Sequence, residues 1–176
     1  MDALLLIDLQ EDFLGAPGLA ERRRELLDQV QRWVDLAARR AVPVIEVRTE
    51  LPRDPSAWAL NMREDHHPVA LEGTDGTARA HELDVDPVAV VRKRRDDAFL
   101  GTDLDDRLTE LGAQDLVLCG VSTEACVALT AAQAYARDYR VRLGAVASAD
   151  QRAHAQALAW LAEQYRQSHV TPDDVD

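Results

Sequence analysis

Three side chains that lie far apart in the sequence, Asp8, Lys93 and Cys126, are of the types that together can turn a thiol into a nucleophile. A free thiol is mostly protonated at neutral pH, so it needs a base that takes its proton or a positive charge that favours the thiolate. Asp8 can serve as the base, and Lys93 can supply the charge. These residue types therefore predict attack by the Cys126 sulfur on an electrophilic carbon.

Each of these residues also has an ordinary structural interpretation. An aspartate at the end of a strand is often a cap or a solvated loop residue, and Lys93 stands within a basic run, residues 92–95, whose composition is typical of a solvated patch. A lone cysteine among small apolar residues usually packs as a small hydrophobe. Cys119, inside an apolar run, is expected to do so, although a redox pair of Cys119 and Cys126 stays open as an alternative.

The elements that must position these side chains are predicted by short runs rich in Val, Leu and Ile. Such runs alternate with longer stretches of helical periodicity, which is typical of a parallel sheet with helices on both faces. We therefore expect a three-layer α/β/α fold with a central, mostly parallel sheet of five to six strands. The runs are residues 4–9, 42–47, 88–92, 116–119 and 141–145, with a sixth short strand near Val170.

Four helices are predicted between these strands. Residues 19–40 carry an apolar stripe at three-to-four spacing, and this helix should end before Pro43, because the residue before a proline avoids the helical region. Gly112 is expected to stop a second helix over 103–111. The alanine-rich stretches 123–137 and 153–165 complete the set.

The predicted sheet places all three chemical groups at one edge, because ligands of parallel sheets bind beyond the carboxyl ends of the strands. Asp8 ends the first strand, Lys93 follows the third, and Cys126 lies in the first turn of the helix after the fourth. The amino end of that helix adds about half a positive charge, which favours a thiolate. Its free backbone N–H groups could hold the oxyanion of a tetrahedral intermediate.

The long segment over residues 48–86 holds three prolines and paired histidines and shows no long periodicity, so we expect an extended loop with one helical turn. Trp58 within it is expected to wall a pocket, because a tryptophan in a long loop has few core partners. The full set of predicted substrate contacts is Gln10, Phe13, Trp58, Asn61, Phe99 and Glu124. Core packing is the alternative for Phe13 and Phe99, and a helix-end role is the alternative for Glu124.

Three sequence blocks resemble the signatures of the isochorismatase-like cysteine hydrolases. They are LLLIDLQEDF at residues 4–13, KRRDDAFLGTDLDDRL at 93–108 and GVSTEACVALTAAQAYARD at 120–138. This superfamily includes nicotinamidases, N-carbamoylsarcosine amidohydrolase and ureidoacrylate amidohydrolase. The likeness extends over most of the chain, so we expect one domain of this kind over residues 1–176.

The resemblance implies roles for residues of this chain. The family's catalytic aspartate, lysine and cysteine fall on Asp8, Lys93 and Cys126. It further implies a cis peptide bond between Val121 and Ser122, with the N–H groups of Ser122 and Cys126 forming the oxyanion hole. It implies no cofactor, and it suggests a homo-oligomer.

Two departures from relatives narrow the expected chemistry. Nicotinamidases carry an Asp-x-His pair after the second strand, where this chain has Arg48, Thr49 and Glu50, so we predict no metal; His66 and His67 are read as loop residues. Isochorismatases that split a vinyl ether lack the cysteine nucleophile, so Cys126 favours attack on a carbonyl carbon. We expect cleavage of a C–N bond in a small amide, ureido or carbamoyl compound through a thioester. Vinyl ether hydrolysis and a non-catalytic binding module are the alternatives.

Composition excludes several other classes of function. The formal net charge is -12, and an acidic surface repels nucleic acid and anionic lipid. Hydrophobic residues make up 47% of the chain, which is typical of a globular protein. The first apolar run is too short for a signal or membrane segment, so we expect a cytoplasmic protein with a small-molecule substrate.

Overall fold

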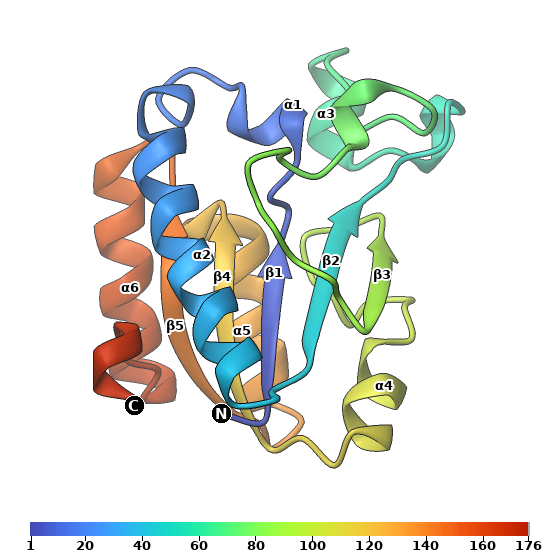
Figure 1. The fold of residues 1–176 in the computed structure, drawn as a ribbon. Coiled ribbons are helices and arrows are strands. Elements are labelled where there is room, and N and C mark those ends of the chain that lie inside the picture. The colour runs from blue at the N-terminus through green and yellow to red at the C-terminus, as the bar shows by residue number, and fades with distance from the viewer. Residues whose placement is uncertain (176) are drawn as a thin grey trace.

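The computed structural model describes residues 1–175 and contains one parallel sheet (Figure 1). Its strands lie in the order β3-β2-β1-β4-β5, and every neighbouring pair is parallel. This confirms the predicted fold class. The strands are β1 (Ala3–Ile7), β2 (Val44–Thr49), β3 (Ala89–Lys93), β4 (Asp115–Val121) and β5 (Arg140–Ala147). The prediction of a sixth strand near Val170 is wrong, because that segment forms only an isolated bridge between His169 and Leu143.

The helices are α1 (Glu11–Leu14), α2 (Arg23–Arg39), α3 (Leu60–Glu64), α4 (Leu104–Glu110), α5 (Ala128–Tyr135) and α6 (Gln151–Tyr165). The α2 helix covers one face of the sheet, α4, α5 and α6 cover the other, and α1 and α3 lie above the strand ends (Figure 1). One core lies between the sheet and α2 and includes the buried Trp33, and the other lies under α4, α5 and α6. Successive residues of β1 alternate between these cores, as a strand requires: Leu4 and Leu6 face α2, while Leu5 and Ile7 face the other side. Each such buried leucine contributes about 1.5–3 kcal/mol relative to an exposed one.

Several helix boundaries differ from the predicted ones for local reasons. Residues Ala20–Arg22 form a 3-10 turn, so α2 begins later than expected. The α6 helix begins at Gln151, because the Asp150 side chain accepts the N–H groups of Arg152 and Ala153 and so caps it. The helix expected over 123–137 is split into a π-helical turn, Thr123–Val127, and the regular helix α5.

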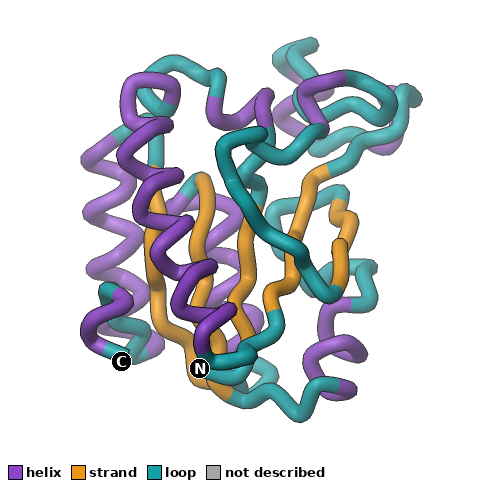
Figure 2. Tube along the Cα trace, viewed as in Figure 1, coloured by secondary structure: helices purple, strands orange, loops and turns teal. Residues whose placement is uncertain are grey.

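The segment between β2 and β3 is more structured than an extended loop. It contains α3 and the 3-10 turns Pro55–Ala57 and Asp75–Thr77, which lie beyond the carboxyl ends of the strands (Figures 1 and 2). Its last residues run back along the α2 side of the sheet to the start of β3, with Ala80 and Leu83 in the core there. Leu51 pairs with Leu71 in a parallel bridge, and the Asp12 carboxylate accepts the N–H of Ala70. These contacts fix the segment above the sheet edge at which the chemical groups were predicted.

Strands β1 and β4 approach each other closely at this edge. Gly120 pairs with Ile7 in the β1–β4 ladder and has a φ of 143°, which side-chain-bearing residues rarely adopt. A Cβ atom at Gly120 would lie 2.0 Å from the carbonyl oxygen of Ile7. Glycine is therefore required where the two backbones meet.

None of the helices within residues 1–175 is both long enough and apolar enough to cross a lipid bilayer.

Candidate active site

Asp8 follows the last residue of β1 and is completely buried. Its backbone turns out of the strand with a φ of 52°, and its N–H still donates to the Val47 carbonyl. The carboxylate Oδ1 accepts two hydrogen bonds from Thr49, from the backbone N–H at 2.8 Å and from the hydroxyl at 3.0 Å. Its Oδ2 lies 2.7 Å from the Lys93 Nζ. The carboxylate is thus held on both sides in one orientation.

Lys93 is the last residue of the edge strand β3 and is only 1% exposed, although Arg92 and Arg94 beside it are exposed. This alternation is the normal period of a strand. The Lys93 ammonium donates to Thr49 Oγ1 at 2.8 Å and to Cys126 Sγ at 3.2 Å. Burial lowers the pKa of Lys93, but the negative charge of Asp8 and the sulfur of Cys126 more than offset this and hold that pKa above its usual value. The side chain is therefore an ammonium at neutral pH.

Cys126 lies in the π-helical turn after β4 and is 7% exposed. Its sulfur contacts the Lys93 ammonium and lies 3.6 Å from Oδ1 of Asp96. Burial and the negative charge of Asp8 raise the pKa of Cys126 well above its ordinary value, and Lys93 only partly opposes them. The resting thiol is neutral, so its activation requires a proton acceptor. Asp8 is a candidate, because its charge and a side-chain hydrogen bond both raise the pKa of Cys126.

Thr49 connects this cluster, and sequence reasoning missed it. It ends β2, pairs in register with Lys93, and uses its hydroxyl to accept from the ammonium and donate to Asp8. The rule that placed Asp8 and Lys93 at the carboxyl edge applies equally to Thr49, so the signal was present. Asp96 was missed as well, although it lies in the same sequence block as Lys93.

Gln10, predicted as a substrate contact, is completely buried and uses its amide within the protein. Its Oε1 accepts the N–H of Thr49 at 2.9 Å, and its Nε2 donates to the carbonyls of Thr49 and Thr77 at 2.9 and 3.0 Å. Gln10 therefore braces the end of β2 against the segment above it, and its amide is not open to a ligand.

The turn that carries Cys126 is tied to β5 and α6 through polar contacts. A cis peptide bond joins Val121 to Ser122 at its start. The N–H of Thr123 donates to Ser148 Oγ at 3.1 Å, and the Thr123 hydroxyl lies 2.8 Å from His154 Nδ1. The Ser148 hydroxyl donates to Glu124, so this predicted substrate contact has a protein partner in the structure.

Phe13 and Phe99, predicted as substrate contacts or as core residues, lie in or against the core. Phe99 is buried, stacks on Tyr139 with ring centroids 6.1 Å apart and has the Arg137 guanidinium 4.6 Å above its ring. Phe13 packs against the core beside α2. Phe99 thus packs as a core residue, which was the alternative interpretation, and its contact with substrate stays a prediction.

Trp58 and Asn61 lie in the segment above the sheet edge. The Trp58 indole N–H donates to the Pro52 carbonyl at 2.8 Å, and its ring borders a hollow of about 430 Å³ beside His66 and Arg63. Asn61 is exposed in the first turn of α3. Within residues 1–175 no described hydrogen bond joins either side chain to Asp8, Lys93 or Cys126.

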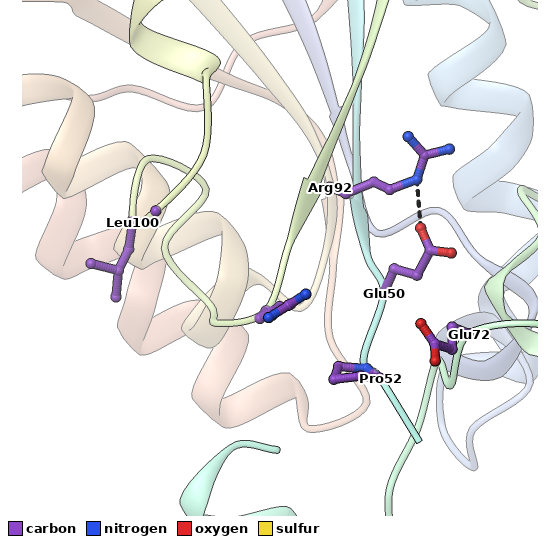
Figure 3. Close-up of a pocket in the computed structure, with 7 residues that line it drawn as sticks. Glu50, Pro52, Glu72, Arg92 and Leu100 are labelled. Atoms are coloured by element: carbon purple, nitrogen blue, oxygen red, sulfur yellow. Dashed lines mark ion pairs between the residues drawn. The ribbon is translucent and has the colours of Figure 1, made fainter. Parts of the chain in front are cut away.

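A larger hollow of about 620 Å³ lies beside the ends of β2 and β3 (Figure 3). The side chains of Glu50 and Arg92 point toward each other and form an ion pair there. The residues that line it are Glu50, Pro52, Glu72, Arg92, Arg94, Leu100 and Gly101. The lining flanks Thr49 and Lys93 in the sequence but does not include them, so this hollow adjoins the buried cluster without containing it.

The residues present do not fit the metal site of a nicotinamidase. Arg48 is bound to the buried Glu46 at 2.7 Å, and Thr49 belongs to the Asp8–Lys93 cluster. Within residues 1–175 one group has metal-like spacing, Glu11, His81 and Glu82. The Arg23 guanidinium already pairs with both of its carboxylates, at 2.7 and 2.8 Å, so a protein cation occupies the oxygens that a metal would need.

Two relatives of known name align with about four fifths of this chain. The streptothricin hydrolase of Streptomyces noursei is 33% identical over 147 residues, which cover 81% of this chain and 48% of that protein. Nicotinamidase 3 of Arabidopsis thaliana is 28% identical over 142 residues, covering 79% of this chain and 68% of that protein. The chain thus spans less than half the length of the streptothricin hydrolases that it matches.

Among solved structures, the pyrazinamidase/nicotinamidase of Streptococcus mutans UA159 superposes with a TM-score of 0.82 at 26% identity, covering 96% of this chain and 99% of that one. The family model described as the isochorismatase domain matches residues 2–172. The resemblance carried by the three sequence blocks is confirmed: the chain belongs to the isochorismatase family.

Proposed function

We propose that this protein is a cysteine hydrolase that cleaves a C–N bond of a small amide, ureido or carbamoyl compound through a thioester. The observation that carries this proposal is the position of the Lys93 ammonium, 2.7 Å from the Asp8 carboxylate and 3.2 Å from the Cys126 sulfur in a buried cluster. Buried charges of this kind are costly unless they are used or paired, and they concentrate at functional sites.

In the first half of the reaction, Asp8 accepts the thiol proton as the Cys126 sulfur attacks the carbonyl carbon. The C–S bond forms, and the carbonyl π electrons move to the oxygen. We assign the N–H groups of Ser122 and Cys126 to this oxyanion. When the oxyanion collapses, the C–N bond breaks, Asp8 returns the proton to the nitrogen, and ammonia or an amine leaves.

In the second half, water replaces the amine. Asp8 takes a proton from the water as the water oxygen attacks the thioester carbon. The C–S bond then breaks, and the sulfur regains the proton from Asp8. The sum is one amide and one water converted to a carboxylic acid and an amine. Lys93 remains an ammonium throughout and stabilises the transient negative charge on the sulfur and on Asp8.

The names of the relatives support the same class of reaction, since nicotinamidase and pyrazinamidase denote hydrolysis of amides. The alternatives fit the site less well. Vinyl ether hydrolysis does not use a cysteine nucleophile, and a non-catalytic module has no need for a buried ammonium beside a thiol. A redox pair is disfavoured because Cys119 faces the α2 core, whereas Cys126 faces the core under α5. One domain over residues 1–176, a homo-oligomer and a cytoplasmic location stay predictions.

The test is a screen of small amides, ureido acids and carbamoyl compounds for release of ammonia, with Cys126→Ala beside the wild type. We expect at least a thousandfold loss of turnover in the variant, on the scale seen when a nucleophile is deleted. Mass spectrometry of the wild type quenched during turnover should find the acyl group on Cys126. A Cys126→Ala variant with wild-type activity on a true substrate would refute the mechanism.

A further inference from the structure

Asp96 is a second carboxylate at the nucleophile and has no part in the mechanism above. Its Oδ1 lies 3.6 Å from Cys126 Sγ, and the residue is exposed whereas the cysteine is buried. A substrate carbonyl bound at the sulfur therefore lies within reach of this carboxylate.

The backbone around Asp96 is fixed to the helix that follows the nucleophile. The completely buried Thr130 of α5 donates its hydroxyl to the Asp96 carbonyl at 3.4 Å and accepts the N–H of Ala98 at 3.1 Å. Because Thr130 lies one helical turn beyond Cys126, the contact between Asp96 and the sulfur is set by one rigid element.

The charges of the cluster do not balance without a ligand. Asp8 and Lys93 form one neutral pair, and the resting thiol is neutral. Asp96 adds one negative charge, and among residues 1–175 no described ion pair joins it to a lysine, arginine or histidine. Asp96 also raises the pKa of Cys126, which works against thiolate formation.

An unpaired carboxylate at this place opposes the reaction of a neutral amide, because attack creates an oxyanion beside it. A positive group on the substrate would remove this opposition by pairing with Asp96. The charge-assisted hydrogen bond between this positive group and Asp96 would also hold the substrate close to the Cys126 sulfur.

We propose that Asp96 is a specificity residue that binds an ammonium or guanidinium group of the substrate, so that this site prefers cationic amides. The preference for cationic amides rests on the proposed amide hydrolysis. The preference of the Cys126 sulfur for positively charged reagents can be measured without any substrate.

The first experiment compares three amides of similar size: 3-aminopropanamide, which is cationic, butanamide, which is neutral, and malonamate, which is anionic. We expect kcat/KM to fall in that order for the wild type. Asp96→Asn should lower kcat/KM for the cationic amide about tenfold, the effect of one charge about 4 to 5 Å away at a partly exposed site. It should leave the neutral amide unchanged or faster, and Asp96→Lys should favour the anionic amide.

The matched control is Asp97→Asn, which removes the same charge one residue away. Asp97 points elsewhere, since its Oδ1 accepts the N–H of Phe99 at 2.8 Å, and an asparagine can keep that contact. The ratio of cationic to neutral kcat/KM should change by less than about twofold in this variant. If Asp96→Asn slows all three amides equally, Asp96 transfers protons or positions the loop, and the specificity proposal is wrong.

The second experiment needs no substrate. Cys126 is modified with 2-aminoethyl methanethiosulfonate, which is cationic, and with 2-sulfonatoethyl methanethiosulfonate, which is anionic, and the label is located by mass spectrometry. The wild type should react faster with the cationic reagent, and Asp96→Asn should reduce the ratio of the two rates about tenfold. High salt should weaken this difference.

These two experiments separate the two proposals. If no amide is hydrolysed but the ratio of labelling rates depends on Asp96, the proposed function fails and the charge preference stands. If amides are hydrolysed and the ratio is the same in the wild type and in Asp96→Asn, the role of Asp96 is refuted while the hydrolase remains.

Discussion

The two cysteines of this protein lie close together in the chain and are both buried, but their surroundings differ. Cys119 is inside β4, facing α2, where its sulfur accepts the N–H of Ala145 at 3.3 Å; burial raises its pKa to about 12. Cys126 lies in the turn after that strand, with the Lys93 ammonium 3.2 Å from its sulfur. Burial alone makes a thiol inert, and a fixed cation with a nearby base is what distinguishes a nucleophile.

The largest expected effect is on turnover by the two cysteine variants. Cys126→Ser should lower kcat at least about a thousandfold, because a hydroxyl in this site is a far weaker nucleophile than the sulfur. Cys119→Ala should keep kcat within about threefold and instead lower the free energy of unfolding by about 1–2 kcal/mol, as expected for a small buried deletion. Steady-state kinetics and urea unfolding measure the two quantities. Equal losses of kcat in both variants would break the comparison.

The next largest effect is on the free energy of unfolding when Lys93, the cation beside Cys126, is removed. Lys93→Met leaves Asp8 buried without its partner, so we expect a loss of about 3–5 kcal/mol in the free energy of unfolding. The double variant Asp8→Asn with Lys93→Met should recover part of this stability, because no buried charge is left, and should remain inactive. Urea unfolding of the wild type, the single variants Lys93→Met and Asp8→Asn, and the double variant measures the coupling. Additive losses would contradict a direct pair.

A third effect is the response of stability to alkaline pH. Because burial raises the pKa of Cys119 to about 12, the folded protein keeps this proton over a range in which the unfolded chain releases it. The corresponding stability is fully present below the unfolded value, about 8.5, and is lost as the pH rises toward 12, by at most about 1.4 kcal/mol per pH unit.

The variant Cys119→Ala isolates this contribution. Between pH 9 and 11 its free energy of unfolding should fall less steeply than that of the wild type, whereas at pH 7 to 8 the two slopes should agree. Parallel curves over the whole range would show that the Cys119 thiol is not protected from ionisation by burial.

The smallest effect concerns the contacts that hold the nucleophile turn. Ser148→Ala leaves the Thr123 N–H without its acceptor and frees Glu124, so we expect a loss of about 1 kcal/mol in stability. If Ser148 positions Cys126 through this turn, kcat should fall severalfold with little change in KM, and Ser148→Thr should restore it. A loss of stability with unchanged kcat would make Ser148 purely structural.

The sequence allowed the sheet, its parallel direction and the three central residues of the site to be predicted, because strand ends follow from apolar runs. It hid the burial of Lys93, since the composition of its basic run indicates a solvated patch, whereas the alternation along β3 turns only Lys93 inward. Thr49 was overlooked although the strand-end rule applied to it, whereas the contact of Asp96 with the sulfur depends on side-chain direction, which the sequence does not give. Sequence alone left two interpretations open for Phe99, and in the structure the turn at Asp97 directs its ring into the core beside Tyr139.

The glycine contact between β1 and β4 has a consequence for how this protein can change. Gly120 brings the backbone that leads to Cys126 against Ile7, the residue before Asp8. The spacing of acid and sulfur is therefore set by two main chains in contact and owes little to the segment between β2 and β3. That segment can vary in length and composition, and so admit new ligands, without the reaction centre having to be rebuilt.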